Sequence, residues 1–160
     1  ARSLGATVIG VAGSAGKLAW VAAGADHAFV ADDPALSDRI RALAPAGVDV
    51  VYDFVGRATF PLAVACVRDG GVIATIGAAS GQAPPAADHL RSRAVQLRGG
   101  GTPQYVRGET VVSATAQLWD AIRAGLFGDL PIARYPFDRI AVAHEDMEAR
   151  RLAGLPVITV

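Results

Sequence analysis

Residues 7–17 read TVIGVAGSAGK, and this stretch decides the fold that we expect for the chain. An apolar run over residues 7–11 gives way to a turn of small residues, which Lys17 and a helix-forming run over 18–22 then follow. Strand, glycine-containing turn and helix form the unit that presents backbone N–H groups and a helix N-terminus to an anion. The sequence therefore predicts a βα unit that could hold a phosphate.

Two phosphate-binding patterns can be tested on this turn, and both fail. A P-loop needs Gly five residues before its Gly-Lys pair and Ser or Thr after it, but Val11 and Leu18 stand there. A GxGxxG fingerprint would need Gly at position 11 together with Gly13 and Gly16. The turn is therefore no pyrophosphate loop. It suits the end of a second strand, where the adenosine ribose of a dinucleotide lies.

The polar residues of this turn bear on the choice between the two nicotinamide cofactors. NAD favours a carboxylate here for the ribose 2′-hydroxyl, whereas NADP favours a cation and small donors for the 2′-phosphate. No acid follows the strand before Asp26, while Ser14 offers a hydroxyl and Lys17, the chain's single lysine, offers a charge. A plainer interpretation is that Lys17 solvates the first turn of a surface helix, and the stretch alone favours it.

The amino-acid composition limits the classes of protein to which the chain could belong. The chain has 160 residues, 52% of them hydrophobic, and equal numbers of acidic and basic residues, 15 each, so one domain without a nucleic-acid or membrane partner is expected. No apolar stretch of about 18 uncharged residues predicts a membrane span. Cys66 is the single cysteine, and His27, His89 and His144 lack ligand spacing, so we expect no metal site.

Strand and helix patterns alternate along the chain. The pattern over residues 48–53, VDVVYD, is apolar on both faces, as in a buried parallel strand. The Asp-Gly-Gly at 69–71 is expected to end a helix. Repeated strand–helix units with short connections predict an α/β, doubly wound parallel sheet. We expect strands over 7–11, 27–30, 48–53, 72–76, 95–98 and 156–160, and helices over 17–23, 35–43, 58–67, 109–124 and 140–151.

Five stretches, in order and at matching spacing, resemble the medium-chain dehydrogenase/reductase superfamily, and most of all its zinc-free quinone oxidoreductase branch. They are LGATVIGVAGSAGK (4–17), AAGADHAF (22–29), GVDVVYDFVG (47–56), DGGVIATIGAASG (69–81) and YPFDRIAVAHEDMEAR (135–150). The resemblance implies a Rossmann-like dinucleotide-binding domain over 1–125, N-terminally truncated and lacking its first, central strand. Residues 126–160 would return to the catalytic domain. The chain would thus begin inside a fold.

The resemblance also implies which residues face the cofactor, NADP(H). Gly13, Ser14 and Lys17 would hold the adenosine 2′-phosphate. Arg150 would reach the same phosphate from a returning helix, or would simply end that helix in solvent. The remaining candidates cap later strands at the carboxyl edge of the sheet, where ligands bind: Phe54, Val55 and Gly56 after the third strand, Ile76, Gly77, Ala78 and Ala79 along the nicotinamide ribose, and Gly101 and Thr102 near the carboxamide. Phe54 would narrow the cleft or stack on the cofactor, or would serve in ordinary helix–sheet packing.

The activity that the resemblance implies is hydride transfer from NADPH to a quinone or another α,β-unsaturated carbonyl, with the proton donor on the absent domain and no catalytic residue in this chain. Three alternatives remain open: an enoyl reductase module of a polyketide synthase, a zinc-dependent alcohol dehydrogenase, and a nucleotide-binding remnant without turnover. A methyltransferase is more distant. We expect a cytoplasmic homodimer joined through the edge strand near 95–101, and we expect residues 1–160 alone to be marginally stable and inactive.

Overall fold

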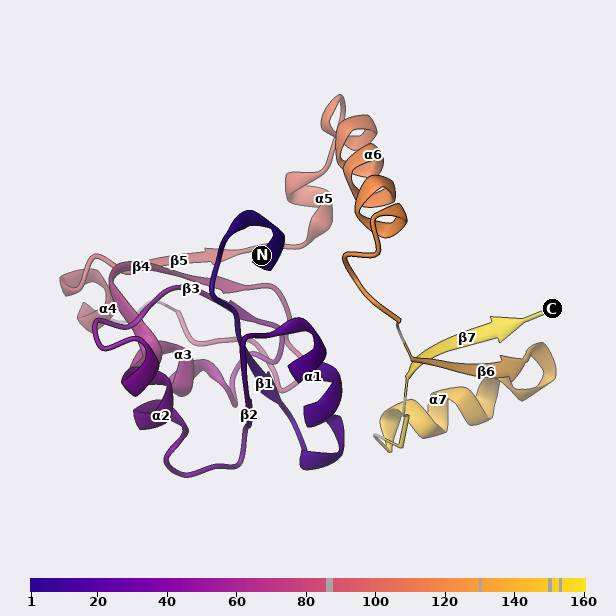
Figure 1. Cartoon of the computed structure of the whole chain (residues 1–160), viewed down its shortest axis with the longest axis horizontal. Coiled ribbons are helices and arrows are strands. Elements are labelled where there is room, and N and C mark those ends of the chain that lie inside the picture. Colours follow the sequence, from indigo (N-terminus) through magenta and orange to yellow (C-terminus); the bar gives the residue numbers. More distant parts are fainter. Residues whose placement is uncertain (86–87, 130, 150, 153) are drawn as a thin grey trace. The chain divides into compact units, whose positions relative to one another are not determined.

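Strands and helices alternate along the chain as the hydropathy pattern predicts, and every strand pair in the described residues is parallel (Figure 1). The computed structural model describes residues 1–85, 88–129, 131–149, 151–152 and 154–160. The strands are β1 (Ile9–Ala12), β2 (His27–Val30), β3 (Val48–Asp53), β4 (Val67–Thr75), β5 (Gln96–Gly99), β6 (Ile132–Pro136) and β7 (Leu155–Thr159). The α/β class with parallel sheets is as predicted.

The helices are mostly short. They are α1 (Leu18–Gly24), α2 (Leu36–Leu43), α3 (Phe60–Cys66), α4 (Asp88–Ser92), α5 (Thr102–Tyr105), α6 (Thr110–Arg123) and α7 (Ile140–Glu148), with single 3₁₀ turns at η1 (Arg2–Leu4), η2 (Ala15–Lys17) and η3 (Phe137–Arg139). Within the described residues, none of these helices combines the length and the apolar character that crossing a bilayer requires. The chain divides into two compact units, Ala31–Thr115 and the pair of segments Ala1–Val30 and Ala116–Val160.

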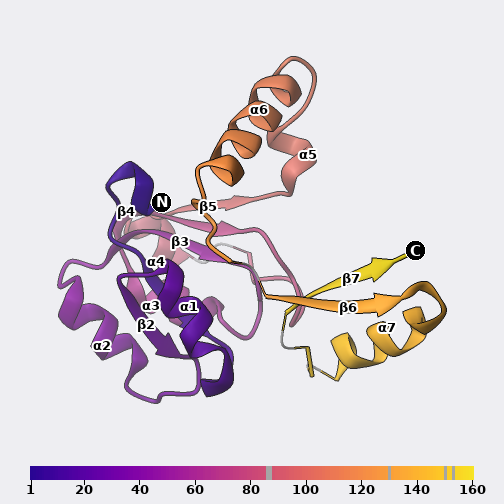
Figure 2. The same ribbon diagram turned by 45° about the vertical axis from the view of Figure 1, so that its right-hand side comes forward.

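The unit Ala31–Thr115 is built on a three-stranded sheet in the order β3-β4-β5 (Figure 2). One face of this sheet carries the core, because Val67 and Ile73 on β4 are fully buried against α3 and Leu90 of α4. The core residues are Phe60, Ala63, Val67, Ile73, Leu90 and Val95. Burial of this apolar surface provides the main stabilisation of the unit.

The opposite face of β3 differs from the expectation of a strand buried on both sides. Val50 and Tyr52 are 44% and 63% exposed, whereas Val51 packs against the core. The physical reason is that the strand alternates its side chains between two faces, and the core of this unit lies on only one of them. The apolar character of this second face is therefore not explained by contacts among the described residues.

The end of α3 is held by two arginines rather than by a glycine turn. Arg41 donates from Nε and Nη2 to the carbonyl oxygen of Ala65, at 3.0 and 2.8 Å, and Arg93 donates to the carbonyl oxygens of Val64 and Val67, at 3.1 and 2.6 Å. Cationic donors suit the unpaired carbonyls of a helix C-terminus. The chain passes directly from α3 into β4, which runs through 69–71, so the prediction that this Asp-Gly-Gly ends the helix was wrong.

The segment Ala1–Val30 forms one βαβ unit. β1 pairs with β2 from Ile9↔His27 to Ala12↔Val30, and α1 packs on both strands. Gly10 permits this close packing, because a Cβ there would collide with the side chain of Val21. No ladder in the described residues joins β1 to β3. Those two strands would flank the first strand in the order that the resemblance implies.

The C-terminal segment forms a second parallel pair, β6 and β7, with α7 lying along both strands (Figure 1). The Tyr135 hydroxyl on β6 donates to Oδ2 of Asp146 on α7 at 2.8 Å, and Arg151 Nε donates to Oδ1 at 2.8 Å. These two donors hold the pKa of Asp146 below its usual value, and the bond to Asp146 raises the pKa of Tyr135. They fix α7 against its strand.

Candidate cofactor site

The turn between β1 and α1 is open and lightly held. Ser14 is extended, and the Lys17 N–H donates to the Ser14 carbonyl oxygen at 3.1 Å, which closes the single turn η2. No other atom lies within 4 Å of where a Cβ would stand on Gly13 or Gly16. No ion pair of Lys17 and no cap made by the Ser14 hydroxyl occurs in the described residues. An anion could thus approach both the hydroxyl and the ammonium group.

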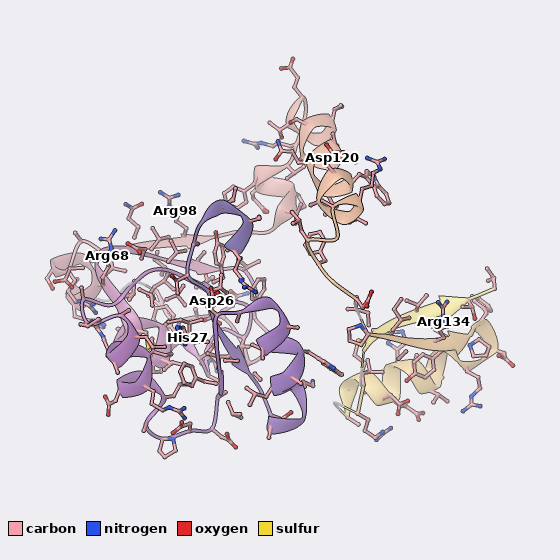
Figure 3. The ribbon with its side chains drawn as sticks, viewed as in Figure 1. Asp26, His27, Arg68, Arg98, Asp120 and Arg134 are labelled. Atoms are coloured by element: carbon pink, nitrogen blue, oxygen red, sulfur yellow. The ribbon has the colours of Figure 1, made fainter. Side chains whose placement is uncertain are left out.

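The first acidic residue after β1 is Asp26, and it makes its contacts away from the turn. Asp26 stands beside His27 at the beginning of β2 (Figure 3), where its Oδ2 accepts the Val8 N–H at 2.8 Å and its Oδ1 pairs with Arg2 Nε at 3.1 Å. Because β1 and β2 are parallel, this position lies at the amino end of β1, away from the turn. Asp26 is therefore not the carboxylate that would accept a ribose 2′-hydroxyl.

Asp53, the last residue of β3, organises the loop that follows it. It is 4% exposed and is the only buried charged side chain among the described residues. Its Oδ1 accepts the N–H groups of Val55 and Gly56, both at 2.9 Å, and the Thr59 hydroxyl at 2.7 Å. Its Oδ2 has no hydrogen-bond partner within the described ranges. Hydrogen bonds to this one carboxyl oxygen thus fix the backbone path of residues 54–59.

The same loop is joined to the loop after β4. The Asp53 carbonyl oxygen accepts the N–H groups of Ile76 and Gly77, at 2.8 and 3.2 Å. The Ser80 hydroxyl donates to the Val55 carbonyl oxygen at 2.8 Å and accepts the Ala58 N–H at 2.9 Å. The two loops, which the sequence singles out separately, therefore form one hydrogen-bonded edge of the β3-β4-β5 sheet.

Glycines are required where these loops meet. Gly56 has a φ of 92°, in the left-handed region, and a Cβ there would collide with the carbonyl oxygen of Gly81. A Cβ on Gly77 would collide with the carbonyl oxygen of Phe54. Both glycines are therefore needed for the fold of this edge, before any ligand is considered.

A hollow of about 490 Å³ opens on the exposed face of the same sheet. Its apolar floor comes from β3 and β4, and Arg98, which projects from β5 in Figure 3, adds a charge. Gln104 Oε1 accepts the Gly101 N–H at 2.8 Å, and the Tyr105 hydroxyl donates to the Gly99 carbonyl oxygen at 2.8 Å, so α5 fixes the rim. The lining residues are Val50, Tyr52, Val72, Ala74, Ile76, Arg98, Gly99, Gly100, Gly101, Thr102, Tyr105 and Val106.

The structure groups most of the predicted site residues. Three share the turn after β1: Gly13, Ser14 and Lys17. Seven share the joined loops: Phe54, Val55, Gly56, Ile76, Gly77, Ala78 and Ala79. Three line the hollow: Ile76, Gly101 and Thr102. Phe54 is 61% exposed, so packing among the described residues does not account for it. Arg150 lies outside the described residues.

Sequence reasoning missed the residues that hold these loops together, Asp53, Thr59 and Ser80. A signal was present: an acid at a strand end followed three residues later by Gly and six residues later by Thr is typical of an Asx-type turn that leads into a helix. Asp53 also completes the strand pattern over 48–53, which conceals this signal.

The described residues offer no group of three or more His, Cys, Asp or Glu side chains that could hold a metal ion. Cys66 is buried in α3, and burial raises the pKa of its thiol. It is a core residue of the helix.

Comparisons with known proteins identify what this arrangement resembles. Residues 1–114 match the family model described as zinc-binding dehydrogenase. A 2-haloacrylate reductase from a Burkholderia species is 29% identical over 164 residues, which is 99% of this chain and 49% of that protein. A mycobacterial protein solved in complex with NADPH is 32% identical with a TM-score of 0.86, over 99% of this chain and 50% of that one. Escherichia coli quinone oxidoreductase, also complexed with NADPH, is 26% identical with a TM-score of 0.88, over 99% and 51%. The chain thus spans about half the length of these relatives.

Proposed function

The chain belongs to the zinc-binding dehydrogenase family, and on that basis we propose that it is the cofactor-binding part of an NADPH-dependent oxidoreductase. The observation that carries the choice of NADPH is the turn after β1. Lys17 has no ion-pair partner in the described residues, Ser14 lies three residues before it in the same turn, and Asp26 is bound at the other end of the strand. These are the groups that a 2′-phosphate needs and that a 2′-hydroxyl does not.

The joined loops after β3 and β4 are proposed to carry the nicotinamide half. Their exposed backbone, at Phe54, Val55, Ala78 and Ala79, is free of bulky polar side chains, so a ribose can approach closely. When bound, the cofactor supplies the hydride, and the chain's own residues orient it and limit access of water. Gly101 and Thr102 on the rim of the hollow are proposed to lie near the carboxamide. Arg150 is proposed as a second contact to the 2′-phosphate.

The proposed substrate is a quinone or another α,β-unsaturated carbonyl. One relative is named for quinones and another for 2-haloacrylate, and both substrates present an electron-poor carbon–carbon double bond conjugated to a carbonyl group. Hydride would add to the carbon distal to the carbonyl, and a proton would complete the reduction. The proton donor is proposed to belong to a catalytic domain that residues 126–160 rejoin, with 1–125 forming the dinucleotide domain.

The proposed assembly is a homodimer joined through β5, acting in the cytoplasm. β5 pairs only with β4 among the described strands, so its other edge is unpaired there. An unpaired edge is a template for pairing with a second strand. Sedimentation of the full-length protein at micromolar concentration tests this, and a monomer would refute it.

The experiment that tests the function uses the full-length protein. NADPH oxidation is followed with a quinone, an enone and a 2-haloacrylate, and NADH serves as the control cofactor. We expect turnover with NADPH and at least one of the three acceptors. Turnover only with an alcohol and an oxidised cofactor, together with bound zinc, would instead support an alcohol dehydrogenase. Tight NADPH binding without turnover would support a nucleotide-binding remnant.

A further inference from the structure

Asp53 is placed to serve the cofactor although it is not exposed to it. Its side chain is buried, and its hydrogen bonds run to two different loops. The side-chain oxygen Oδ1 accepts hydrogen bonds from Val55, Gly56 and Thr59. The backbone carbonyl oxygen of Asp53 accepts those of Ile76 and Gly77. No other described side chain makes three hydrogen bonds through one oxygen to the loop after β3.

These hydrogen bonds fix the positions of backbone atoms, and they place no charge at the protein surface. Gly56 is kept at a φ of 92° by the bond from its N–H to Oδ1, and the loops meet with no room for a Cβ. A ligand that lies along backbone atoms is bound only as well as those atoms are placed, because errors of a fraction of an ångström weaken every contact.

We propose that the Asp53 side chain is a positioning group for the nicotinamide end of the cofactor, acting through the backbone of residues 54–56 and through Thr59. This inference rests on the proposed function, and it adds a residue that acts at a distance from the ligand. Asp53 would affect the affinity for the nicotinamide half of the cofactor, which NADPH and NADH share. Lys17 would set affinity for the 2′-phosphate that distinguishes them.

The unpaired oxygen of Asp53 makes the Asp53→Asn substitution informative. The amide keeps one oxygen to accept hydrogen bonds, but it places an NH₂ group where Oδ2 is buried without a partner. An unpaired buried donor destabilises its surroundings. Since this variant could lose stability for that reason, a milder substitution is also made. Thr59→Val removes the hydroxyl that donates to Oδ1 at 2.7 Å and to the Gly56 carbonyl oxygen at 3.2 Å, and Thr59→Ser keeps it.

The test measures dissociation constants for NADPH and for NADH by titration of the full-length protein, with a thermal melt of each variant. Asp49→Asn is the matched control, because Asp49 is on the same strand, its side chain is 80% exposed, and it contacts only Arg68 in the described hydrogen bonds. We expect D53N and T59V to weaken both nucleotides by the same factor, about 5- to 30-fold, the scale of one or two hydrogen bonds. T59S and D49N should bind as the wild type does.

Two results would overturn the proposal. Unchanged affinities in both D53N and T59V would do so, and a lowered melting temperature beside them would show that Asp53 is purely structural. So would a loss confined to NADPH, since that would place the effect at the 2′-phosphate. Failure of the wild type to bind either nucleotide would refute the proposed function itself, and the wild-type titration identifies that case separately.

Discussion

The turn after β1 and the joined loops after β3 and β4 are built in opposite ways. In the turn, two backbone hydrogen bonds close η2, from the Lys17 N–H to the Ser14 carbonyl oxygen and from the Leu18 N–H to that of Ala15, and Gly13 and Gly16 have open space around them. In the joined loops, Asp53 and Ser80 together supply hydrogen bonds to both sides, and Gly56 and Gly77 have no space for a methyl group. Both regions follow parallel strands in glycine-rich sequence, yet glycine has a different role in each.

The two regions differ in what would decide ligand binding: the identity of the side chains in the turn, and the position of the backbone in the joined loops. In the turn, ligand binding would depend on which side chains are present, because the side chains of Ser14 and Lys17 have few contacts and the fold does not require them. In the joined loops, what matters is where the backbone lies, because the side chains there serve each other. Substitutions in the turn should therefore change the affinity for a ligand with little effect on stability. Substitutions in the joined loops should change stability and, because the backbone there would move, the affinity for NADPH and NADH alike.

The largest effect is expected for Gly77→Ala. A Cβ at this position would collide with the carbonyl oxygen of Phe54, so the two loops would have to separate, at a cost of about 3–5 kcal/mol in unfolding free energy. Thermal and urea unfolding of the full-length protein measure this. A wild-type melt for this variant would show that the joined loops are not rigid.

Lys17→Ala should act on binding instead. Loss of a charge-assisted hydrogen bond to the 2′-phosphate should weaken NADPH binding by about 1–3 kcal/mol and leave NADH binding almost unchanged. Titration of both nucleotides into the full-length protein tests this. Equal losses for the two cofactors would contradict the assignment of the turn.

Ser80→Ala should cost less than Gly77→Ala, because it breaks the junction without a collision. The Ala58 N–H loses its acceptor and the Val55 carbonyl oxygen loses one of two donors, the other being the Ser80 N–H. We expect a loss of about 1–2 kcal/mol in unfolding free energy. Ser80→Thr keeps the hydroxyl and is the matched control in the same unfolding assay.

The smallest effect is expected for Gly16→Ala, the counterpart of Gly77→Ala in the open turn. Nothing lies within 4 Å of the added methyl group, and Gly16 does not have a positive φ. The unfolding free energy should change by no more than about 0.5 kcal/mol. A loss comparable to that of Gly77→Ala would remove the distinction between the two regions.

Much of the fold could be predicted because its pattern is local. The alternation of β-branched runs with amphipathic stretches placed five of the seven observed strands to within about two residues, and the expected superfamily was confirmed by the family match. β4 begins five residues before the strand expected over 72–76, and β6 is not among the expected strands. The end of α3 could not be predicted, since it depends on Arg41 and Arg93, which are distant in sequence.

The sequence marks the candidate loops by their glycines and small residues, and it does not mark the residues whose role depends on burial. Gly56 and Gly77 stand out in the sequence because only glycine suits such positions. Asp53 is marked only by the spacing of Gly56 and Thr59 after it, since the acid itself looks the same in sequence whether it faces water or three donors. The junction with Ser80 joins residues more than twenty positions apart, and no local pattern reports such a contact.

The position of β4 between two parallel neighbours has a consequence for exchange of backbone amide protons with solvent. Residues 72–75 pair with β3 on one side and β5 on the other, so their successive N–H groups are hydrogen-bonded on alternating sides, and Ile73 is fully buried. Among the described strands, β1 and β2 pair only with each other. In deuterated water we expect the β4 amides to exchange last, through opening of the whole Ala31–Thr115 unit, while those of β1 exchange through a smaller, local opening.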